Sequence, residues 1–374
     1  MLSSKLERTR YKVKRAYNFN PGPAALPLEV LEQAREELVE FGGQGMSLME
    51  MSHRSKPVER MMEETQQLLT ELLGLPQGYR VLFMGGGAST QFALIPMNFL
   101  AADRVGHYVL SGSFSDKAYQ EAVAVGEANV IASGKADKWR KLPDVGELKV
   151  DENAAYVHLT TNNTIEGTQF RELPDVGNVP LIGDMTSDML SRKLDWTKLG
   201  FMYAGAQKNL GPAGVTVAIV REDLLKASAE RTIPTILKYA TFASNQSLYN
   251  TPPVHSIYVM KLVLEWTKRQ GGVEEMQRRA ALRTGLLYET IDASGGFYNG
   301  FADKDARSLM NVTWRMQDEA TEKRFVQEAE QNGFVGLAGH RSVGGLRASA
   351  YNAVPVEACE ALVQFMRDFQ RRNG

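Results

Sequence analysis

The feature that most constrains the fold is an alternation of short apolar runs with amphipathic or polar stretches, from residue 17 to about residue 268. The apolar runs resemble buried strands: RVLFM, GHYVLSG, NVIAS, AAYVHLTT, VPLIGD, FMYAGA and VTVAIV. Some stretches around them, such as VERMMEETQQLLTELLG, carry leucine and methionine at three- and four-residue spacing, as amphipathic helices do. This rhythm is typical of a mostly parallel sheet wrapped by helices, so we expect an α/β fold.

The C-terminal part of the chain has a different pattern. A long helical run ends at Gly271-Gly272, and further helical runs alternate with two strand candidates, NVTWRM and a segment containing LRASA. The 374 residues also exceed the usual size of one domain. We therefore predict an N-terminal arm over 1–16, a large domain over 17–268 and a smaller α+β domain over 269–374.

Charge and cysteine content exclude several classes of partner. The 43 basic and 44 acidic side chains nearly cancel, so the net charge favours neither nucleic acid nor an anionic membrane as a partner. One cysteine, Cys359, cannot form an intrachain disulfide or a cysteine-rich metal site, and no metal is expected. No apolar run approaches the roughly 20 residues that span a bilayer, and the basic first fifteen residues lack the apolar segment of a secretory signal. We predict a cytoplasmic protein.

Lys208 lies in FMYAGAQKNLGPAGVTVAIV, where a strand-like run ends in small residues and a second strand follows. Lysines usually occupy solvated faces, so a surface lysine on a tight connection is the alternative interpretation. The neighbours Ala204, Gly205 and Ala206 would, however, leave space for a flat and bulky group. A lysine that forms a Schiff base needs such a site.

Asp184 ends the strand candidate VPLIGD. Ligands of doubly wound sheets bind beyond the carboxyl ends of the strands, and an aspartate there can keep a pyridinium nitrogen protonated. A cap on the next helix is the alternative role. Lys208 follows 24 residues later, after one helix-sized stretch and one strand, so we expect the two strand ends to lie side by side.

The turn GGGAST, from Gly85 to Thr90, joins the strand candidate RVLFM to a helical segment. Glycines let the backbone approach an anion, and a helix N-terminus offers free N–H groups and a positive dipole end. The Walker pattern and the dinucleotide fingerprint are both absent. The turn has the form of a phosphate cradle, with an ordinary glycine-rich turn as the alternative.

Two His-Arg pairs, His53-Arg54 and His340-Arg341, lie on short polar connections, and Arg347 follows the second pair. A guanidinium group matches the oxygens of a carboxylate or a phosphate with a fork of donors. Three arginines supply more donors than one carboxylate needs, so they fit a substrate with both groups. Solvated surface charge is the alternative for each residue.

These segments together resemble the phosphoserine aminotransferase family. The resemblance lies in FNPGPAALP, SLMEMSHRSK, the glycine turn, YAGAQKNLGPAG, NTPP and GHRSVGGLRASAYNA, and it runs from about residue 17 to the C-terminus. It implies fold-type I of the pyridoxal 5'-phosphate enzymes and a homodimer with active sites at the subunit interface. It also implies transfer of the amino group of L-glutamate to 3-phosphohydroxypyruvate, which gives O-phospho-L-serine and 2-oxoglutarate in serine biosynthesis. A further part in pyridoxine biosynthesis is left open.

The resemblance assigns roles to individual residues. Lys208 would be the Schiff-base lysine, Asp184 the partner of the pyridinium nitrogen, and Arg347 the group that binds the substrate carboxylate. The other implied cofactor contacts are Ala88, Ser89, Phe114, Thr164 and Gln207, with Asn250 and Thr251 reaching the cofactor phosphate of the neighbouring subunit. The implied substrate-phosphate side consists of His53, Arg54, His340 and Arg341, partly across the dimer interface.

Two positions depart from the pattern of some family members. Phe114 replaces a tryptophan that stacks on the cofactor ring, and phenylalanine can still stack with a smaller face. Ser89 replaces an arginine, which removes one donor to the substrate phosphate and leaves the phosphate contacts open.

Other functions remain to be separated from this one. Another aminotransferase of the same fold, acting on glyoxylate or pyruvate, would share Lys208 and Asp184 but need fewer phosphate donors. A cysteine desulfurase needs a mobile nucleophilic cysteine, whereas Cys359 lies on an apparent helix near the wrong end of the chain. A dehydrogenase would bind NAD without a Schiff base, and a non-catalytic protein that binds anionic metabolites would show no turnover.

Overall fold

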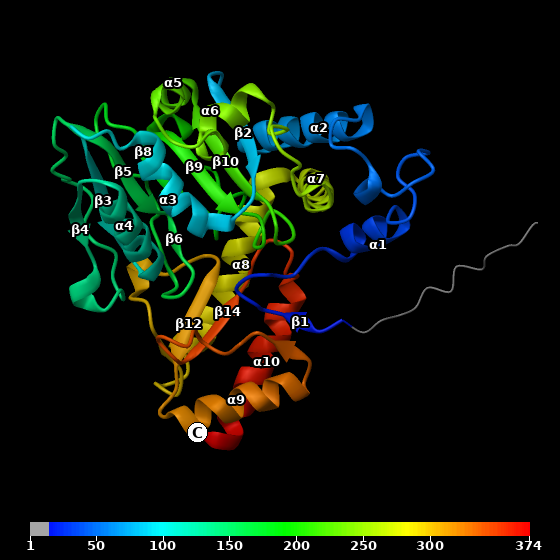
Figure 1. The fold of residues 1–374 in the computed structure, drawn as a ribbon. Helices are drawn as coiled ribbons and strands as arrows, with labels where there is room; N and C mark the ends of the chain where they lie inside the picture. The colour runs from blue at the N-terminus through cyan, green and yellow to red at the C-terminus, as the bar shows by residue number, and fades with distance from the viewer. Residues whose placement is uncertain (1–14) are drawn as a thin grey trace, which may run out of the picture.

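The computed structural model describes residues 15–374 and has a seven-stranded sheet at its centre (Figure 1). The strand order is β2 (Tyr79–Met84), β10 (Thr216–Arg221), β9 (Leu199–Gly205), β8 (Leu181–Asp184), β5 (Ala154–Thr160), β3 (Val105–Leu110) and β4 (Ala128–Ser133). Only β10 runs antiparallel to its neighbours in this sheet. The predicted α/β fold is confirmed, and all seven strand candidates of the large unit lie in this sheet. The predicted arm over 1–16 lies outside the described residues apart from its last two.

Helices cover both faces of the sheet, because successive strand residues point to opposite sides and both sides are apolar here. One face packs on α2 (Lys56–Leu73) and α7 (Val254–Arg269), with α1 (Leu28–Glu36) beyond α7. The other face packs on α3 (Gly87–Phe99) and α4 (Ser113–Val125), with α5 (Glu222–Glu230) and α6 (Tyr239–Ser244) beside them. Along β2, for example, Val81 and Phe83 join the first cluster while Leu82 and Met84 join the second.

A smaller unit follows the long helix α8 (Gly272–Asp292) and lies below the sheet in Figure 1. It contains a three-stranded sheet of β11 (Asn299–Gly300), β12 (Asn311–Arg315) and β14 (Leu346–Ser349), together with α9 (Glu319–Gln331) and α10 (Val356–Asn373). The short strand β13 (Phe334–Val335) pairs with β1 (Tyr17–Asn18) from the start of the described chain. Phe19 consequently packs in the core of this C-terminal unit. The domain division at residue 268 remains a proposal.

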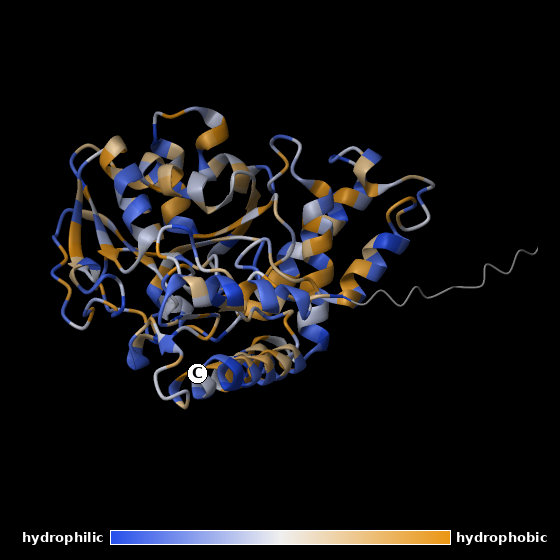
Figure 2. Cartoon of the chain, turned by 90° about the horizontal axis from the view of Figure 1, so that it is seen from below, coloured by the Kyte–Doolittle hydropathy of each residue, from blue (hydrophilic) through white to orange (hydrophobic). Residues whose placement is uncertain are grey.

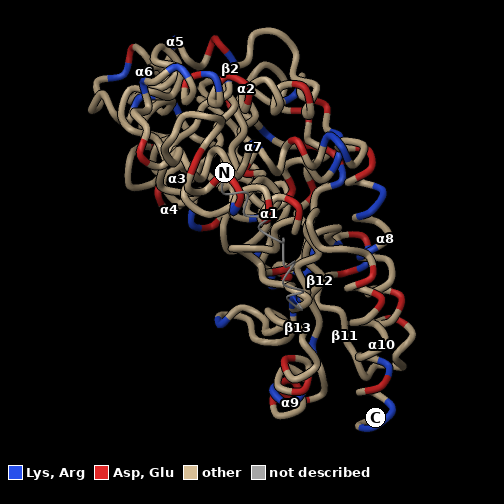
Figure 3. The backbone as a smooth tube through the Cα atoms, turned by 90° about the vertical axis from the view of Figure 1, so that its right-hand side faces the viewer, with Lys and Arg blue, Asp and Glu red and all other residues tan. Residues whose placement is uncertain are grey.

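Charged residues of both signs are spread along the helices of the C-terminal part of the chain. Apolar and polar positions alternate around the helices near the C-terminus (Figure 2), and Cys359 is buried on the apolar side of α10. Basic and acidic residues are interspersed along α8, α9 and α10 (Figure 3), in keeping with the near-neutral composition. None of the described helices combines the length and the apolar character needed to cross a bilayer.

Phe325 lies at the centre of the aromatic packing in the core of the C-terminal unit. Its ring lies 5.1 Å from the rings of both Phe365 and Phe369 and 6.1 Å from that of Trp314, measured between centroids. We expect Phe325→Ala to lower the free energy of unfolding by about 3–5 kcal/mol, because it leaves a cavity among these rings. Urea titration measures the change. The exposed Leu282 is the control, and Leu282→Ala should stay within about 0.5 kcal/mol of the parent protein.

Candidate active site

Lys208 lies in a cavity of about 420 Å³ at the carboxyl ends of β5, β8 and β9, the edge where ligands of α/β sheets bind. The cavity brings together residues that are far apart in the sequence. Among the predicted site residues, those that line it are Ala88, Ser89, Phe114, Thr164, Asp184, Gln207, Lys208, His340 and Arg347.

The Lys208 amine is buried and held in one position. Its Nζ donates a hydrogen bond of 2.5 Å to Thr164 Oγ1 and lies 5.7 Å from the centre of the Phe114 ring. Burial lowers the pKa of Lys208 to about 8, against the opposing effect of the Asp184 carboxylate. The uncharged fraction of the amine near neutral pH is therefore far larger than that of an ordinary lysine, which favours a role as a nucleophile. The alternative of a solvated surface lysine does not fit this environment.

Gly22 covers the stem of this lysine. A Cβ atom added at Gly22 would lie 3.3 Å from Lys208 Cγ, and the backbone there has a φ of +136°, which L-residues rarely adopt. The next turn is fixed by the Ala24 N–H, which donates to the Gln207 carbonyl at 2.9 Å. The segment FNPGPAALP is thus part of the cavity wall, a placement that the sequence pattern did not predict.

Asp184 ends β8 and is paired with Tyr203 of β9, so the two strand ends do lie side by side as predicted. The stretch between them is made of turns and a short 3-10 helix (Trp196–Lys198) rather than a full helix. Asp184 Oδ1 accepts the Thr186 N–H at 3.0 Å within a turn, so the helix-cap alternative is wrong.

Two opposing influences act on the pKa of the Asp184 carboxylate. Burial raises its pKa, whereas the hydrogen bonds from Thr186 and the positive charge of Lys208 lower it. A buried carboxylate that keeps its charge attracts a cationic partner strongly. The arrangement suits a protonated ring nitrogen.

The glycine turn forms one end of the cavity. Gly86 caps α3 with a φ of +91°, and a Cβ atom there would overlap the side chain of Thr90, whose hydroxyl donates to the Gly86 carbonyl at 2.8 Å. Ala88 and Ser89 follow in the first turn of α3, where N–H groups have no partner within the helix. The turn therefore retains the form of an anion cradle.

Arg347 extends from β14 of the C-terminal unit into the cavity. One guanidinium nitrogen, Nη1, donates to the Thr164 carbonyl at 3.1 Å, and burial lowers the pKa of Arg347. Its Nε has no hydrogen-bond partner among the described residues. A buried guanidinium with donors to spare is suited to bind a carboxylate. His340 also lines the cavity, and burial together with the charge of Arg347 lowers its pKa.

Five predicted residues do not line this cavity in the single chain. His53 Nδ1 lies 3.2 Å from Thr251 Oγ1, and Arg54 lines a separate surface cavity with Tyr249. The predicted residues outside the Lys208 cavity are His53, Arg54, Asn250, Thr251 and Arg341. Their roles across a subunit interface stay predictions.

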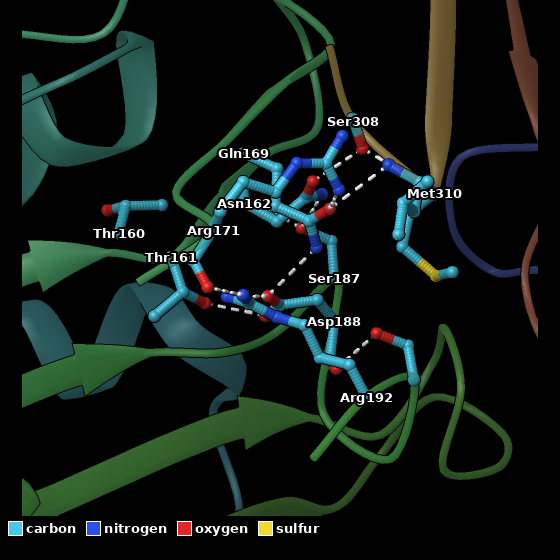
Figure 4. Close-up of polar contacts among 12 residues, drawn as sticks. Thr160, Thr161, Asn162, Gln169, Arg171, Ser187, Asp188, Arg192, Ser308 and Met310 are labelled. Atoms are coloured by element: carbon cyan, nitrogen blue, oxygen red, sulfur yellow. Dashed lines mark hydrogen bonds and ion pairs between the residues drawn. The ribbon is translucent and has the colours of Figure 1, made fainter. Parts of the chain in front are cut away.

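A buried acid, Asp188, connects the elements around the site (Figure 4). Its Oδ1 accepts from Thr161 Oγ1 at 2.5 Å, and its Oδ2 accepts from Gln169 Nε2 at 3.2 Å and Arg192 Nη2 at 3.1 Å. The Thr161 backbone N–H donates to the Asp184 carbonyl at 3.0 Å. Asp188 thereby ties the turn after Asp184 to the hairpin of β6 (Asn162–Asn163) and β7 (Thr168–Gln169).

The same hairpin joins the cavity to the C-terminal unit. Asn162 Nδ2 donates to Ser187 Oγ at 2.7 Å and to Asn311 Oδ1 at 2.8 Å, while Ser308 Oγ donates to Asn162 Oδ1 at 2.5 Å. A fully hydrogen-bonded side-chain amide of this kind specifies one relative arrangement of its neighbours. Asn162 was not predicted as a site residue, although it directly follows the predicted strand AAYVHLTT, which is the signal that could have identified it.

Glu166 is a second buried acid that the sequence pattern did not identify. Its Oε1 accepts the Ser113 N–H at 2.8 Å and the Ser113 hydroxyl at 2.6 Å, at the first turn of α4 that carries Phe114. Burial raises the pKa of Glu166, and the hydrogen bonds from Ser113 oppose that shift. The contact fixes the start of α4 and with it the Phe114 ring.

Comparison with known proteins identifies the family of this chain. The family model described as aminotransferase class-V matches residues 16–362, which is most of the chain.

Individual relatives are more specific. Phosphoserine aminotransferase from Niallia circulans is 57% identical over 361 residues, covering 96% of this chain and 99% of the relative. The solved structure of the enzyme from Bacillus circulans subsp. alkalophilus has a TM-score of 0.94 at 56% identity and covers 97% of this chain and all of that one. The structure of the pyridoxal-phosphate-bound enzyme from Trichomonas vaginalis has a TM-score of 0.87 at 36% identity, with 94% and 100% covered. The chain belongs to the phosphoserine aminotransferase family.

Breaking the buried Asp188–Arg192 ion pair should lower the free energy of unfolding much more than breaking an exposed ion pair. Both side chains are almost fully buried, so Asp188→Ala leaves an unpaired guanidinium and should lower the free energy of unfolding by about 3–5 kcal/mol. The pair Glu71–Lys268 is exposed, and Glu71→Ala should cost less than about 1 kcal/mol. Urea titration of the two variants measures both values. Equal losses would show that burial does not set the cost of breaking these pairs.

Proposed function

We propose that this protein is a phosphoserine aminotransferase, which transfers the amino group of L-glutamate to 3-phosphohydroxypyruvate. The products are O-phospho-L-serine and 2-oxoglutarate, and the role is in serine biosynthesis. The observation that carries this proposal is the buried Lys208 amine beside Asp184 and Arg347, in a chain that matches named phosphoserine aminotransferases over nearly its whole length.

The cavity fits pyridoxal 5'-phosphate by its donors and its size. Gly86 and the first turn of α3 suit the phosphate, Phe114 suits the face of the ring, Asp184 suits the ring nitrogen and Lys208 suits the aldehyde. Thr164 and Gln207 line the same cavity. When bound, this cofactor supplies an electron sink for the charge left on the substrate α-carbon.

The residues of the chain carry out the proton transfers and the binding. The Lys208 amine, held by Thr164, removes a proton from the α-carbon of the bound amino acid as a base and returns one as an acid. Its pKa of about 8 suits both roles near neutral pH. Arg347 binds the α-carboxylate that both substrates share. The same cavity accepts glutamate and then the phosphorylated oxo acid, so ping-pong kinetics are expected.

The finer parts of the proposal concern the partner subunit. We propose a homodimer in which Asn250 and Thr251 reach the neighbouring cofactor phosphate. The side chains of His53, Arg54, His340 and Arg341 would then bind the γ-carboxylate or the phosphate of the substrate. The proximity of His53 and Thr251 supports a shared role for the two segments. A cytoplasmic location completes the proposal and rests on the single buried thiol, Cys359.

The main alternative is an aminotransferase of the same fold that acts on unphosphorylated substrates. Relative rates on O-phospho-L-serine and L-serine separate the two, because a phosphate site gives the phosphorylated substrate a large advantage in kcat/KM. A preference for L-serine would contradict the proposed substrate, and a protein that binds both ligands without turnover would be a binding protein.

The cofactor and the donor half-reaction can be tested together by absorption spectroscopy. The purified protein with pyridoxal phosphate should show a near-visible band that shifts on addition of glutamate. Borohydride should fix the cofactor on Lys208, as seen by peptide mass spectrometry. Lys208→Ala should reduce turnover by at least about 100-fold, because the proton carrier at the α-carbon is lost. Turnover near that of the parent protein would overturn the assignment.

The pKa of Lys208 also predicts a pH dependence. The uncharged amine is the nucleophile, so the rate of covalent capture of pyridoxal phosphate by the cofactor-free protein should rise with pH and level off above about pH 8. Stopped-flow absorption from pH 6 to pH 10 measures this profile. A rate that continues to rise up to pH 10 would show that the amine keeps the ordinary pKa of lysine.

A further inference from the structure

Two buried side chains lie behind Asp184, outside the cavity. The parallel strands β5, β8 and β9 are neighbours, with Asp184 opposite Tyr203 in one pairing and His158 opposite Ile182 in the other. His158, Asp184 and Tyr203 therefore share one face of the sheet, since paired residues and every second residue along a strand point the same way. Tyr203 and His158 are fully buried, and neither lines the cavity.

The three side chains form a chain of contacts. The Tyr203 side chain lies beside Asp184 on the paired strand, and the negative charge of Asp184, added to burial, raises the pKa of Tyr203. His158 Nε2 lies 2.9 Å from the same hydroxyl. The Tyr108 ring stacks on the His158 ring, with 5.1 Å between the ring centroids. This packing leaves the imidazole little freedom to turn away.

Burial sets the direction of the hydrogen bonds. It lowers the pKa of His158 to about 3, so the ring is neutral and carries one N–H. Nδ1 has no hydrogen-bond partner among the described residues, and a buried N–H without an acceptor is costly, so the proton belongs on Nε2. Nε2 then donates to the Tyr203 oxygen, which leaves the Tyr203 O–H free to point toward the neighbouring Asp184 carboxylate.

We propose that Tyr203 is a positioning residue for Asp184 and that His158 acts through Tyr203. The pair presents one fixed O–H donor to the carboxylate from the side opposite the cavity. This donor stabilises the ionised form of Asp184 and restrains its rotation, so that the carboxylate stays directed at the cofactor ring nitrogen. The inference rests on the proposed function, because it concerns the group that Asp184 would contact.

Other charged and titratable groups lie near Asp184 and Tyr203 and also influence the pKa values of these two residues. Lys208 and Asp188 act on Asp184, the first lowering its pKa and the second raising it. Tyr108 and Tyr239 add to the raised pKa of Tyr203. All of these groups remain in place when the Tyr203 hydroxyl alone is removed.

The test uses the cofactor-free protein and two forms of the cofactor. Tyr203→Phe should weaken the binding of pyridoxal phosphate about tenfold, because a buried carboxylate loses a donor. It should leave the binding of an analogue with carbon in place of the ring nitrogen unchanged, because Asp184 then has no cationic partner. Tyr156→Phe is the matched control: it removes a buried hydroxyl of the same cluster, one that contacts Tyr108 rather than Asp184. The control should bind both forms like the parent protein.

Variants of His158 test whether it acts through Tyr203. His158→Leu should weaken pyridoxal phosphate binding about threefold in the parent protein and have no further effect in the Tyr203→Phe background, since coupled residues are not additive. His158→Gln keeps an N–H donor in the position of Nε2 and should restore binding. Additive losses would show separate structural effects and overturn this part of the inference.

Three results would contradict the proposal. Equal affinities of Tyr203→Phe and Tyr156→Phe for pyridoxal phosphate would show that the hydroxyl does not act on Asp184. If Tyr203→Phe weakened the binding of pyridoxal phosphate and of the analogue equally, the substitution would have disturbed the whole site rather than the contact with Asp184. In both cases the parent protein would still bind the cofactor on Lys208, so the proposed function would stand. A parent protein that does not bind the cofactor would overturn the function and this inference together.

Discussion

The structure depends on keeping one lysine amine buried and partly uncharged at the carboxyl edge of the sheet. Taking an ammonium group out of water is costly, and here that cost lowers the pKa of Lys208 to about 8 instead of being balanced by a close salt bridge. The Asp184 carboxylate opposes the shift without removing it. Small neighbours make this possible, because Gly22 and the alanines before Lys208 let the backbone approach the lysine stem. The chemistry of the site follows from this balance.

Buried polar groups around the cavity keep the lysine and the aspartate in place. Both carboxylate oxygens of Asp188, the side-chain amide of Asn162 and Oε1 of Glu166 are hydrogen-bonded to groups from other segments. Together these three residues link the strand ends, the β6–β7 hairpin, α4 and the C-terminal unit. Buried polar networks rigidify when their members are satisfied. Arg347 reaches the cavity from β14 of the C-terminal unit, which this network joins to the β6–β7 hairpin.

Much of the architecture was predictable because it depends on local patterns. Apolar runs of strand length predicted all seven strands of the main sheet, and the spacing of Asp184 and Lys208 predicted neighbouring strand ends. The predicted helix-sized stretch between the two residues is mostly turns, since nothing in the pattern distinguished a polar turn from a helix there. Tyr203 and His158 were predicted only as strand residues. Their relation to Asp184 depends on which strands become neighbours, and a parallel sheet does not follow chain order.

The sequence by itself determined the fold class, the neighbouring strand ends that carry Asp184 and Lys208, and the glycine turn, because backbone conformation and strand burial depend on nearby residues. Only the tertiary structure decided which side chains share the cavity. It brought Arg347 and Gly22, from opposite ends of the chain, to one lysine, and it left His53, Arg54, Asn250, Thr251 and Arg341 outside the cavity of the single chain. It also set the protonation of Lys208 and His158, since burial and neighbouring charge are properties of the packed molecule.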